Sequence, residues 1–166
     1  RIGLIGTGIM GAPMCGHLMK AGYELTLTTR TKAKAEHLLQ DGAAWRDTPQ
    51  EVAEASDYVF SMVGYPEDVE SVLLGEEGAL AGMRPGGILV DMTTSKPALA
   101  VAIAEAASEK GVKALDAPVS GGDSGAQAGT LAIMAGGDAQ AFNEIRPLFD
   151  LMGQNVKRMG PAGAGQ

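Results

Sequence analysis

Cysteine is scarce in this sequence, which has a single one, Cys15. One thiol cannot form an internal disulfide or an all-cysteine metal site, so neither can hold the fold together. We expect Cys15 to be a small core residue and the protein to be cytoplasmic, because a reducing compartment suits a chain without disulfides. The two histidines, His17 and His37, have no partner ligands at a suitable spacing, so we expect no metal site.

Basic residues are also few: 13 lysines and arginines face 20 aspartates and glutamates, which gives a net charge of −7. Nucleic acids and anionic membranes attract proteins with a basic surface, so we expect neither as a partner. No apolar run approaches the roughly 18 residues of a membrane-spanning helix. Because the protein is acidic overall, a phosphate-bearing ligand would have to be bound by a few local groups, such as backbone N–H donors or single basic side chains.

The composition is otherwise that of one globular domain. The chain has 166 residues, of which 45% are hydrophobic, enough for a core that needs no disulfides. Glycine is unusually common: 24 of 166 residues is about 14%, roughly twice the usual share. The glycines have no fixed period and stand at the ends of apolar runs, where the backbone must turn tightly or approach something closely.

Short apolar runs alternate with helical stretches along the chain. Strands are predicted at Ile2–Ile5, Glu24–Thr29, Tyr58–Val63, Gly87–Asp91, Val112–Ala117, Thr130–Ala135 and Asn155–Met159. Helices are predicted at Met10–Ala21, Lys32–Gln40, from Thr48 onward, and at Pro66–Leu74, Pro97–Lys110 and Asp138–Met152. Thr48, with Glu51 three residues later, predicts a capping box at the start of its helix. Near-continuous apolar strands are typical of strands buried on both faces. The pattern predicts an α/β protein with a doubly wound, mostly parallel sheet and helices on both faces.

A glycine-rich turn follows the first predicted strand and opens the first predicted helix. It reads Gly6-Thr7-Gly8-Ile9-Met10-Gly11, which is G-x-G-x-x-G. In this context Gly6 makes the tight turn, Gly8 lets a pyrophosphate approach the backbone, and Gly11 lets helix and strand pack closely. Free N–H groups at the helix start then bind the anion without any lysine or arginine. A flavin, another nucleotide, or a loop without a ligand are the alternatives.

The end of the second strand bears on the choice between the two nicotinamide coenzymes. An acid there would bond the ribose 2′-OH and repel a 2′-phosphate. The segment instead reads Thr28-Thr29-Arg30-Thr31-Lys32, without an acid. Because the guanidinium of Arg30 can hold a phosphate with several donors, we expect NADP(H) to be preferred, with NAD(H) as a weaker ligand. A solvated cationic turn is the alternative.

A second glycine-rich segment follows a later strand. It reads Asp116-Ala117-Pro118-Val119-Ser120-Gly121-Gly122. The Ser120 hydroxyl and the unobstructed N–H groups of Gly121 and Gly122 suit a small carboxylate or a carbonyl oxygen. The alternative is a structural turn in which Ser120 acts as a cap.

These segments together resemble a known family. The opening run Ile2-Gly3-Leu4-Ile5-Gly6-Thr7-Gly8-Ile9-Met10-Gly11-Ala12-Pro13-Met14 is similar to that of the β-hydroxyacid dehydrogenases. This family includes 3-hydroxyisobutyrate dehydrogenase, tartronate semialdehyde reductase, the glyoxylate and succinic semialdehyde reductases and, more distantly, 6-phosphogluconate dehydrogenase. Asp116–Gly122 looks like the family's substrate-binding motif. The resemblance covers the whole chain and implies a Rossmann-type fold.

The resemblance also assigns roles to residues. It implies that Thr94 lies by the nicotinamide ribose and that Met62 and Val63 line the coenzyme cleft. It implies that Ser120, Gly121 and Gly122 position the substrate carboxylate and hydroxyl. Thr29-Arg30-Thr31 looks like the Asn-Arg-Thr of NADP-using members, with threonine in place of asparagine.

The catalytic residue of the family is a lysine on the helix after a Gly-x-x-Gly-x-Gly segment, which Gly160–Gln166 resembles. No lysine of this chain fits that place, so we expect residues 1–166 to be one coenzyme-binding domain of a longer protein. The resemblance then implies an all-helical C-terminal domain, through which a homo-oligomer forms. It implies hydride transfer between nicotinamide and a small hydroxyacid or semialdehyde, with little turnover by this chain alone.

Two other functions stay open at this point. The first is a non-catalytic dinucleotide-binding scaffold or sensor that has lost the lysine, which the residues beyond Gln166 would decide. The second is an imine reductase on the same fold, against which the retained Ser120-Gly121-Gly122 segment counts.

Overall fold

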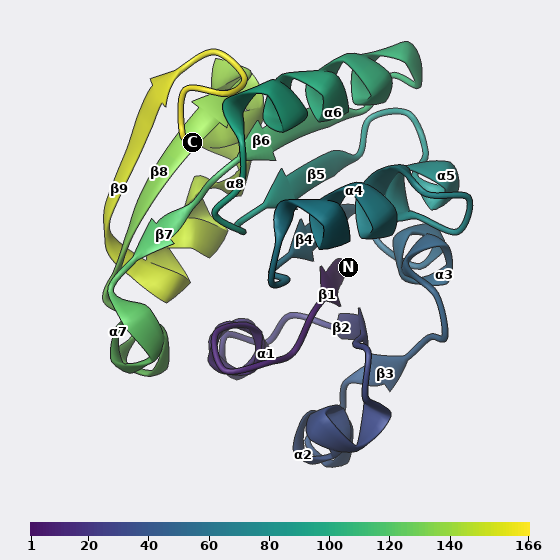
Figure 1. Ribbon diagram of the computed structural model, residues 1–166. Coiled ribbons are helices and arrows are strands. Elements are labelled where there is room, and N and C mark those ends of the chain that lie inside the picture. The colour runs from purple at the N-terminus through teal and green to yellow at the C-terminus, as the bar shows by residue number, and fades with distance from the viewer.

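A single sheet with helices on both faces organises the computed structural model, which describes residues 1–166 (Figure 1). Its strands are β1 (Ile2–Ile5), β2 (Leu25–Thr28), β3 (Ala44–Trp45), β4 (Tyr58–Ser61), β5 (Ile88–Asp91), β6 (Lys113–Asp116), β7 (Val119–Ser120), β8 (Leu131–Gly137) and β9 (Gly153–Gly160). Its helices are α1 (Gly11–Lys20), the 3-10 helix η1 (Lys32–Ala35), α2 (Glu36–Gln40), α3 (Pro49–Glu54), α4 (Pro66–Leu74), α5 (Ala79–Gly82), α6 (Pro97–Glu109), α7 (Gly122–Ala128) and α8 (Ala139–Met152). None of them is long and apolar enough to cross a membrane.

The strand order is β3-β2-β1-β4-β5-β6-β8-β7, with β9 paired to β8. The strands from β3 to β6 are parallel, and β8 runs antiparallel to both β6 and β7. The chain moves from β1 outward through β2 to β3, then returns to the other side of β1 with β4. Ligands of doubly wound sheets bind at such a reversal, beyond the carboxyl ends of the strands. The predicted α/β, mostly parallel sheet is confirmed.

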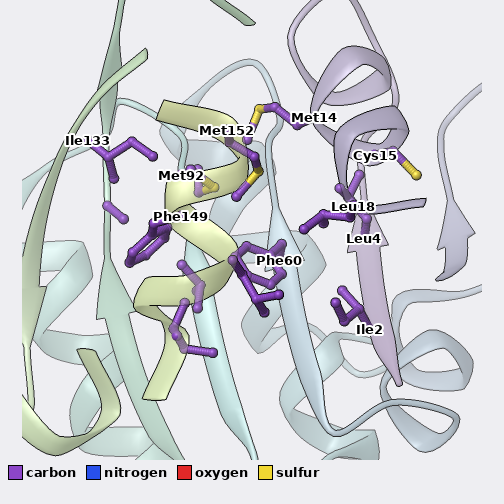
Figure 2. Close-up of a cluster of buried hydrophobic side chains, with 14 of the residues drawn as sticks. Ile2, Leu4, Met14, Cys15, Leu18, Phe60, Met92, Ile133, Phe149 and Met152 are labelled. Atoms are coloured by element: carbon purple, nitrogen blue, oxygen red, sulfur yellow. The ribbon is translucent and has the colours of Figure 1, made fainter. Parts of the chain in front are cut away.

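Two apolar layers hold the helices against the sheet. On one face, Met14 and Leu18 of α1 and Phe149 of α8 pack against strand residues such as Phe60 (Figure 2). The Phe60 and Phe149 rings meet edge to face, with centroids 6.3 Å apart. On the other face, residues of α3, α4, α5 and α6 form a second buried cluster that includes Val69. Burial on both faces explains why the central strands read as continuous apolar runs.

The structure corrects the predicted elements in four places. The predicted helix Lys32–Gln40 is divided into η1 and α2, and four elements in three places were not predicted: β3, α5, and the consecutive β7 and α7. Strands of two residues, such as β3 and β7, are too short to have a periodicity. The sequence of α7, Gly122–Ala128, contains glycines that disfavour helix, and the element is held by its neighbours. His17 Nε2 donates to the carbonyl oxygen of Ala126, at 2.8 Å, and joins α7 to α1.

Side-chain caps are present at the starts of two helices, α3 and α8. The Thr48 hydroxyl accepts a hydrogen bond from the Glu51 N–H at 3.2 Å, which is the predicted cap of α3. Asp138 caps α8 in the same way, through the Ala141 N–H at 2.8 Å. Such caps satisfy N–H groups that have no partner within the helix.

Cys15 lies on the buried face of α1, as predicted, and burial raises the pKa of its thiol to about 12. The nucleophilic thiolate is therefore almost absent at neutral pH. We expect Cys15 to resist a disulfide reagent in the folded chain at pH 8 and to react fully after unfolding in denaturant. Fast labelling of the folded chain would contradict this placement.

Candidate functional site

The turn between β1 and α1 has little room for side chains at its two ends and open space in the middle. Gly6 has φ +96°, and a Cβ there would overlap the carbonyl oxygen of Met62 on β4. A Cβ on Gly11 would overlap the carbonyl oxygen of Gly6, because α1 begins directly against the strand. A Cβ on Gly8 would meet nothing within 4 Å. Gly6 thus forms the tight turn, Gly8 leaves the backbone open to a ligand, and Gly11 lets α1 pack closely on β1, as the motif predicts.

The same turn presents backbone donors that nothing in the protein uses. The N–H groups of Gly8, Ile9, Met10 and Gly11 make no hydrogen bond to a backbone or side-chain acceptor. No side chain caps α1, and its first turn contains no acid. The Ile9 side chain is 74% exposed and points away from the core. Four free N–H groups at the positive end of a ten-residue helix are a binding site for an anion such as a pyrophosphate.

The strands beside this turn end level with it. Register pairs Ile5 with Ser61, Ser61 with Asp91, and Asp91 with Asp116, so four parallel strands finish side by side. The loops that follow therefore open at one edge of the sheet. This edge contains the glycine-rich turn and the segments that the sequence singled out after β4, β5 and β6.

Hydrogen bonds tie the loops after β4 and β5 to each other. The Val63 N–H donates to Thr93 Oγ1 at 2.9 Å, and the Met62 N–H donates to the Ile5 carbonyl oxygen at 2.9 Å. Met62 and Val63 are half-buried, whereas Thr94 is exposed. The structure thus brings these predicted site residues to the edge that holds the glycine-rich turn, and leaves Thr94 free to contact a ligand.

A buried acid that sequence reasoning missed supports this arrangement. Asp91 Oδ1 accepts hydrogen bonds from Ser61 Oγ at 3.0 Å and from the Thr93 N–H at 3.1 Å. Burial raises the pKa of Asp91 to about 6, and these hydrogen bonds and the nearby Asp116 modify the shift in opposite directions. The only sequence signal was an acid at the end of an apolar strand. Asp91 thus fixes the start of the loop after β5 through its hydrogen bond with the Thr93 N–H.

The loop after β2 approaches the glycine-rich turn at its other side. Thr29 Oγ1 accepts a hydrogen bond from the Thr7 N–H at 3.3 Å, so Thr29 helps to hold the turn. The Arg30 side chain is 84% exposed, and its Nη2 donates to Asp68 Oδ1 at 2.9 Å. Thr31 is exposed and precedes η1 without a side-chain cap. Arg30 therefore keeps most of its donors available at this corner.

Asp68 connects that corner to the loop after β4. Its second oxygen, Oδ2, accepts from the Tyr65 N–H at 3.1 Å, at the start of α4. The Arg30–Asp68 pair spans 38 residues of sequence, and no local pattern predicts it. An exposed pair of this kind contributes little to stability, so Arg30 can exchange partners at small cost.

The segment Ser120–Gly122 forms the end of β7 and the start of α7. All three residues are exposed, and Gly121 and Gly122 have φ of +132° and +62°. The segment continues the chain from β6 past the carboxyl edge of the sheet, and α7 then packs against α1. The contact is made by Ala126, so the structure places the later part of α7, and not Ser120–Gly122 itself, against α1. The role of Ser120–Gly122 in binding substrate stays a prediction.

Comparison with known proteins places the chain among coenzyme-binding domains. Residues 1–160 match the family model described as the NAD binding domain of 6-phosphogluconate dehydrogenase. The chain is 57% identical to the probable 3-hydroxyisobutyrate dehydrogenase-like 1, mitochondrial, of Arabidopsis thaliana, over 100% of this chain and 50% of that protein. The chain spans about half the length of the curated relatives it matches.

Solved structures agree with this placement. The 3-hydroxyisobutyrate dehydrogenase of Mycobacterium tuberculosis with L-serine is 34% identical, with a TM-score of 0.91 over 99% of this chain and 55% of that one. An imine reductase from Myxococcus stipitatus in complex with NADP+ is 27% identical, with a TM-score of 0.87 over 99% of this chain and 56% of that one. The chain therefore belongs to the family of the NAD-binding domain of 6-phosphogluconate dehydrogenase, as a dinucleotide-binding domain of the hydroxyacid dehydrogenase type.

Proposed function

We propose that this chain is the coenzyme domain of an NADP-preferring oxidoreductase that acts on a small β-hydroxyacid or the matching semialdehyde. The observation that carries the proposal is the row of four unpartnered N–H groups from Gly8 to Gly11, next to open space at Gly8. Such a row fits the pyrophosphate that joins the two halves of a nicotinamide coenzyme. The 57% identity to a probable 3-hydroxyisobutyrate dehydrogenase-like protein supports the substrate class.

Different residues at the carboxyl edge of the sheet bind different parts of the coenzyme and the substrate. The turn Gly6–Gly11 holds the pyrophosphate, and Met62, Val63 and Thr94 form the wall toward the nicotinamide end. Ser120–Gly122 binds the carboxylate of the substrate through a hydroxyl and free N–H groups. When bound, the coenzyme supplies or accepts the hydride. The general acid and base for the substrate hydroxyl is a lysine of the longer protein, beyond Gln166.

The pyrophosphate site is tested by adding one methyl group to the turn. We expect Gly8→Ala to weaken NADPH and NADH alike, by about tenfold or more, because the new Cβ stands where the pyrophosphate approaches. Gly16→Ala is the matched control, since a Cβ on Gly16 also meets nothing within 4 Å but lies inside α1. Fluorescence titration with each reduced coenzyme gives the dissociation constants, and equal binding by Gly8→Ala and Gly16→Ala would contradict the site.

The preference for NADP(H) rests on Arg30. Its guanidinium has four N–H donors beyond the one given to Asp68, and it stands at the end of β2, where the 2′-substituent of the adenosine ribose is recognised in this fold. A phosphate is a stronger partner for arginine than the carboxylate of Asp68, which is already bonded to the Tyr65 N–H.

Replacing Arg30 by an acid should reverse the preference. Arg30→Glu is expected to lower NADPH affinity by about 10- to 100-fold and to leave or improve NADH affinity, because a carboxylate repels the 2′-phosphate and accepts from the 2′-OH. Lys157→Glu, an equal change of charge on β9 at the far side of the sheet, is the control. A wild-type chain that binds NADH more tightly than NADPH would remove the proposed preference.

The 166-residue chain should bind coenzyme and turn over almost nothing. The proposed lysine and the remainder of the substrate pocket belong to the C-terminal domain, which also forms the homo-oligomer. Incubation of the chain with NADPH and succinic semialdehyde, or with NADP+ and 3-hydroxyisobutyrate, is expected to leave the absorbance of the reduced coenzyme constant. Sustained turnover by this chain alone would show that the catalytic residues lie within it.

A further inference from the structure

The carboxylate of Asp116, at the end of β6, is held by the last residues of the chain. Its Oδ1 accepts from the Gly163 N–H at 2.9 Å, and its Oδ2 accepts from the N–H groups of Gly165 at 3.0 Å and Gln166 at 3.2 Å. The residue is 4% exposed. A buried carboxylate needs such partners, and bonds to a charged acceptor are stronger than those between neutral groups.

The same segment fits against the sheet because it has almost no side chains. A Cβ on Gly165 would overlap the carbonyl oxygen of Met134 on β8. A Cβ on Gly136 would lie 2.8 Å from both Asp116 Oδ1 and the Gly165 nitrogen. The glycines of this segment and of β8 therefore allow a close approach that brings the backbone N–H groups within reach of Asp116.

Gln166 connects this segment to the loop after β5. Its Oε1 accepts from the Ser95 N–H at 2.8 Å, and its Nε2 donates to the Thr93 carbonyl oxygen at 3.0 Å. These two partners flank Thr94, which the proposed function places at the coenzyme. Asp116 and Gln166 together join the ends of β5 and β6 to residues 163–166.

We propose that Asp116 is a positioning residue that fixes the chain segment from which the catalytic lysine follows, with Gln166 setting the distance of that segment from the Thr94 loop. The inference rests on the proposed function, in which the lysine lies just beyond Gln166. A proton-transferring group must be placed closely, since an error of about 1 Å can cost about 100-fold in rate. Five hydrogen bonds, three accepted by Asp116 and two made by the Gln166 side chain, provide that placement over a glycine-rich segment.

The anchor itself is tested in the 166-residue chain by amide hydrogen exchange. Asp116→Asn keeps the shape of the side chain but replaces one acceptor oxygen with an NH2 donor. We expect the Gly163, Gly165 and Gln166 amides to exchange about 10- to 100-fold faster, while amides of the central strands keep their rates. Asp91→Asn is the matched control, because it neutralises a buried carboxylate at the same edge that accepts from Ser61 and Thr93 instead.

A second variant, Gly165→Ala, tests the same anchor if Asp116→Asn does not fold. Gly165→Ala leaves the carboxylate intact and displaces the segment, since its Cβ would overlap the Met134 carbonyl oxygen. The Gly163 and Gln166 amides should again lose protection. Unchanged exchange of these amides in Gly165→Ala, or in a folded Asp116→Asn, would overturn the anchor whether or not coenzyme binds.

The catalytic consequence is measured in the longer protein. Asp116→Asn should lower kcat by about 10- to 100-fold with the NADPH dissociation constant unchanged, because the coenzyme turn is untouched. An unchanged kcat in Asp116→Asn would overturn the positioning role, whereas failure of the wild-type chain to bind either coenzyme would overturn the proposed function itself.

Discussion

The site depends on a helix that begins without a cap. Elsewhere in this fold, Thr48 and Asp138 cover the first N–H groups of α3 and α8 with side-chain oxygens. The start of α1 has no side-chain cap, as is also true of α6, and the N–H groups of Gly8 to Gly11 have no hydrogen-bond partner in the protein. Leaving donors unpaired costs stability, and a bound anion recovers it. An acidic protein with a net charge of −7 can thus bind a negatively charged coenzyme without a basic surface.

The rest of the site is positioned by β4, β5 and β6, whose carboxyl ends lie side by side. Because Ser61, Asp91 and Asp116 are neighbours across β4, β5 and β6, each polar side chain can organise the loop beside it. Asp91 holds the loop after β5, and Asp116 holds the segment that ends the chain. Both carboxylates are buried, and burial, with a smaller contribution from the nearby charge of Asp116, raises the pKa of Asp91. Their N–H partners explain how the fold tolerates them.

The sequence alone predicted what local chemistry determines. Patterns within short stretches of sequence predicted the mostly parallel α/β sheet, the glycine-rich turn and the Thr48 cap. The structure confirms all three. It could not predict β7 and α7, whose formation depends on packing against β8 and α1. Nor could it predict the Arg30–Asp68 pair, because long-range hydrogen bonds leave no periodic trace. The roles of Met62, Val63 and Thr94 came only from the family resemblance, since no local motif marks them as coenzyme contacts.

The most direct measurement is an amide-resolved NMR titration of the chain with NADPH. The account predicts that the Gly8, Ile9, Met10 and Gly11 N–H signals shift downfield as coenzyme binds and that their hydrogen exchange slows, because each gains an acceptor. Changes at β9 and the amino edge of the sheet should be small. Coenzyme binding that leaves these four amides unperturbed, or no binding at all, would contradict the account.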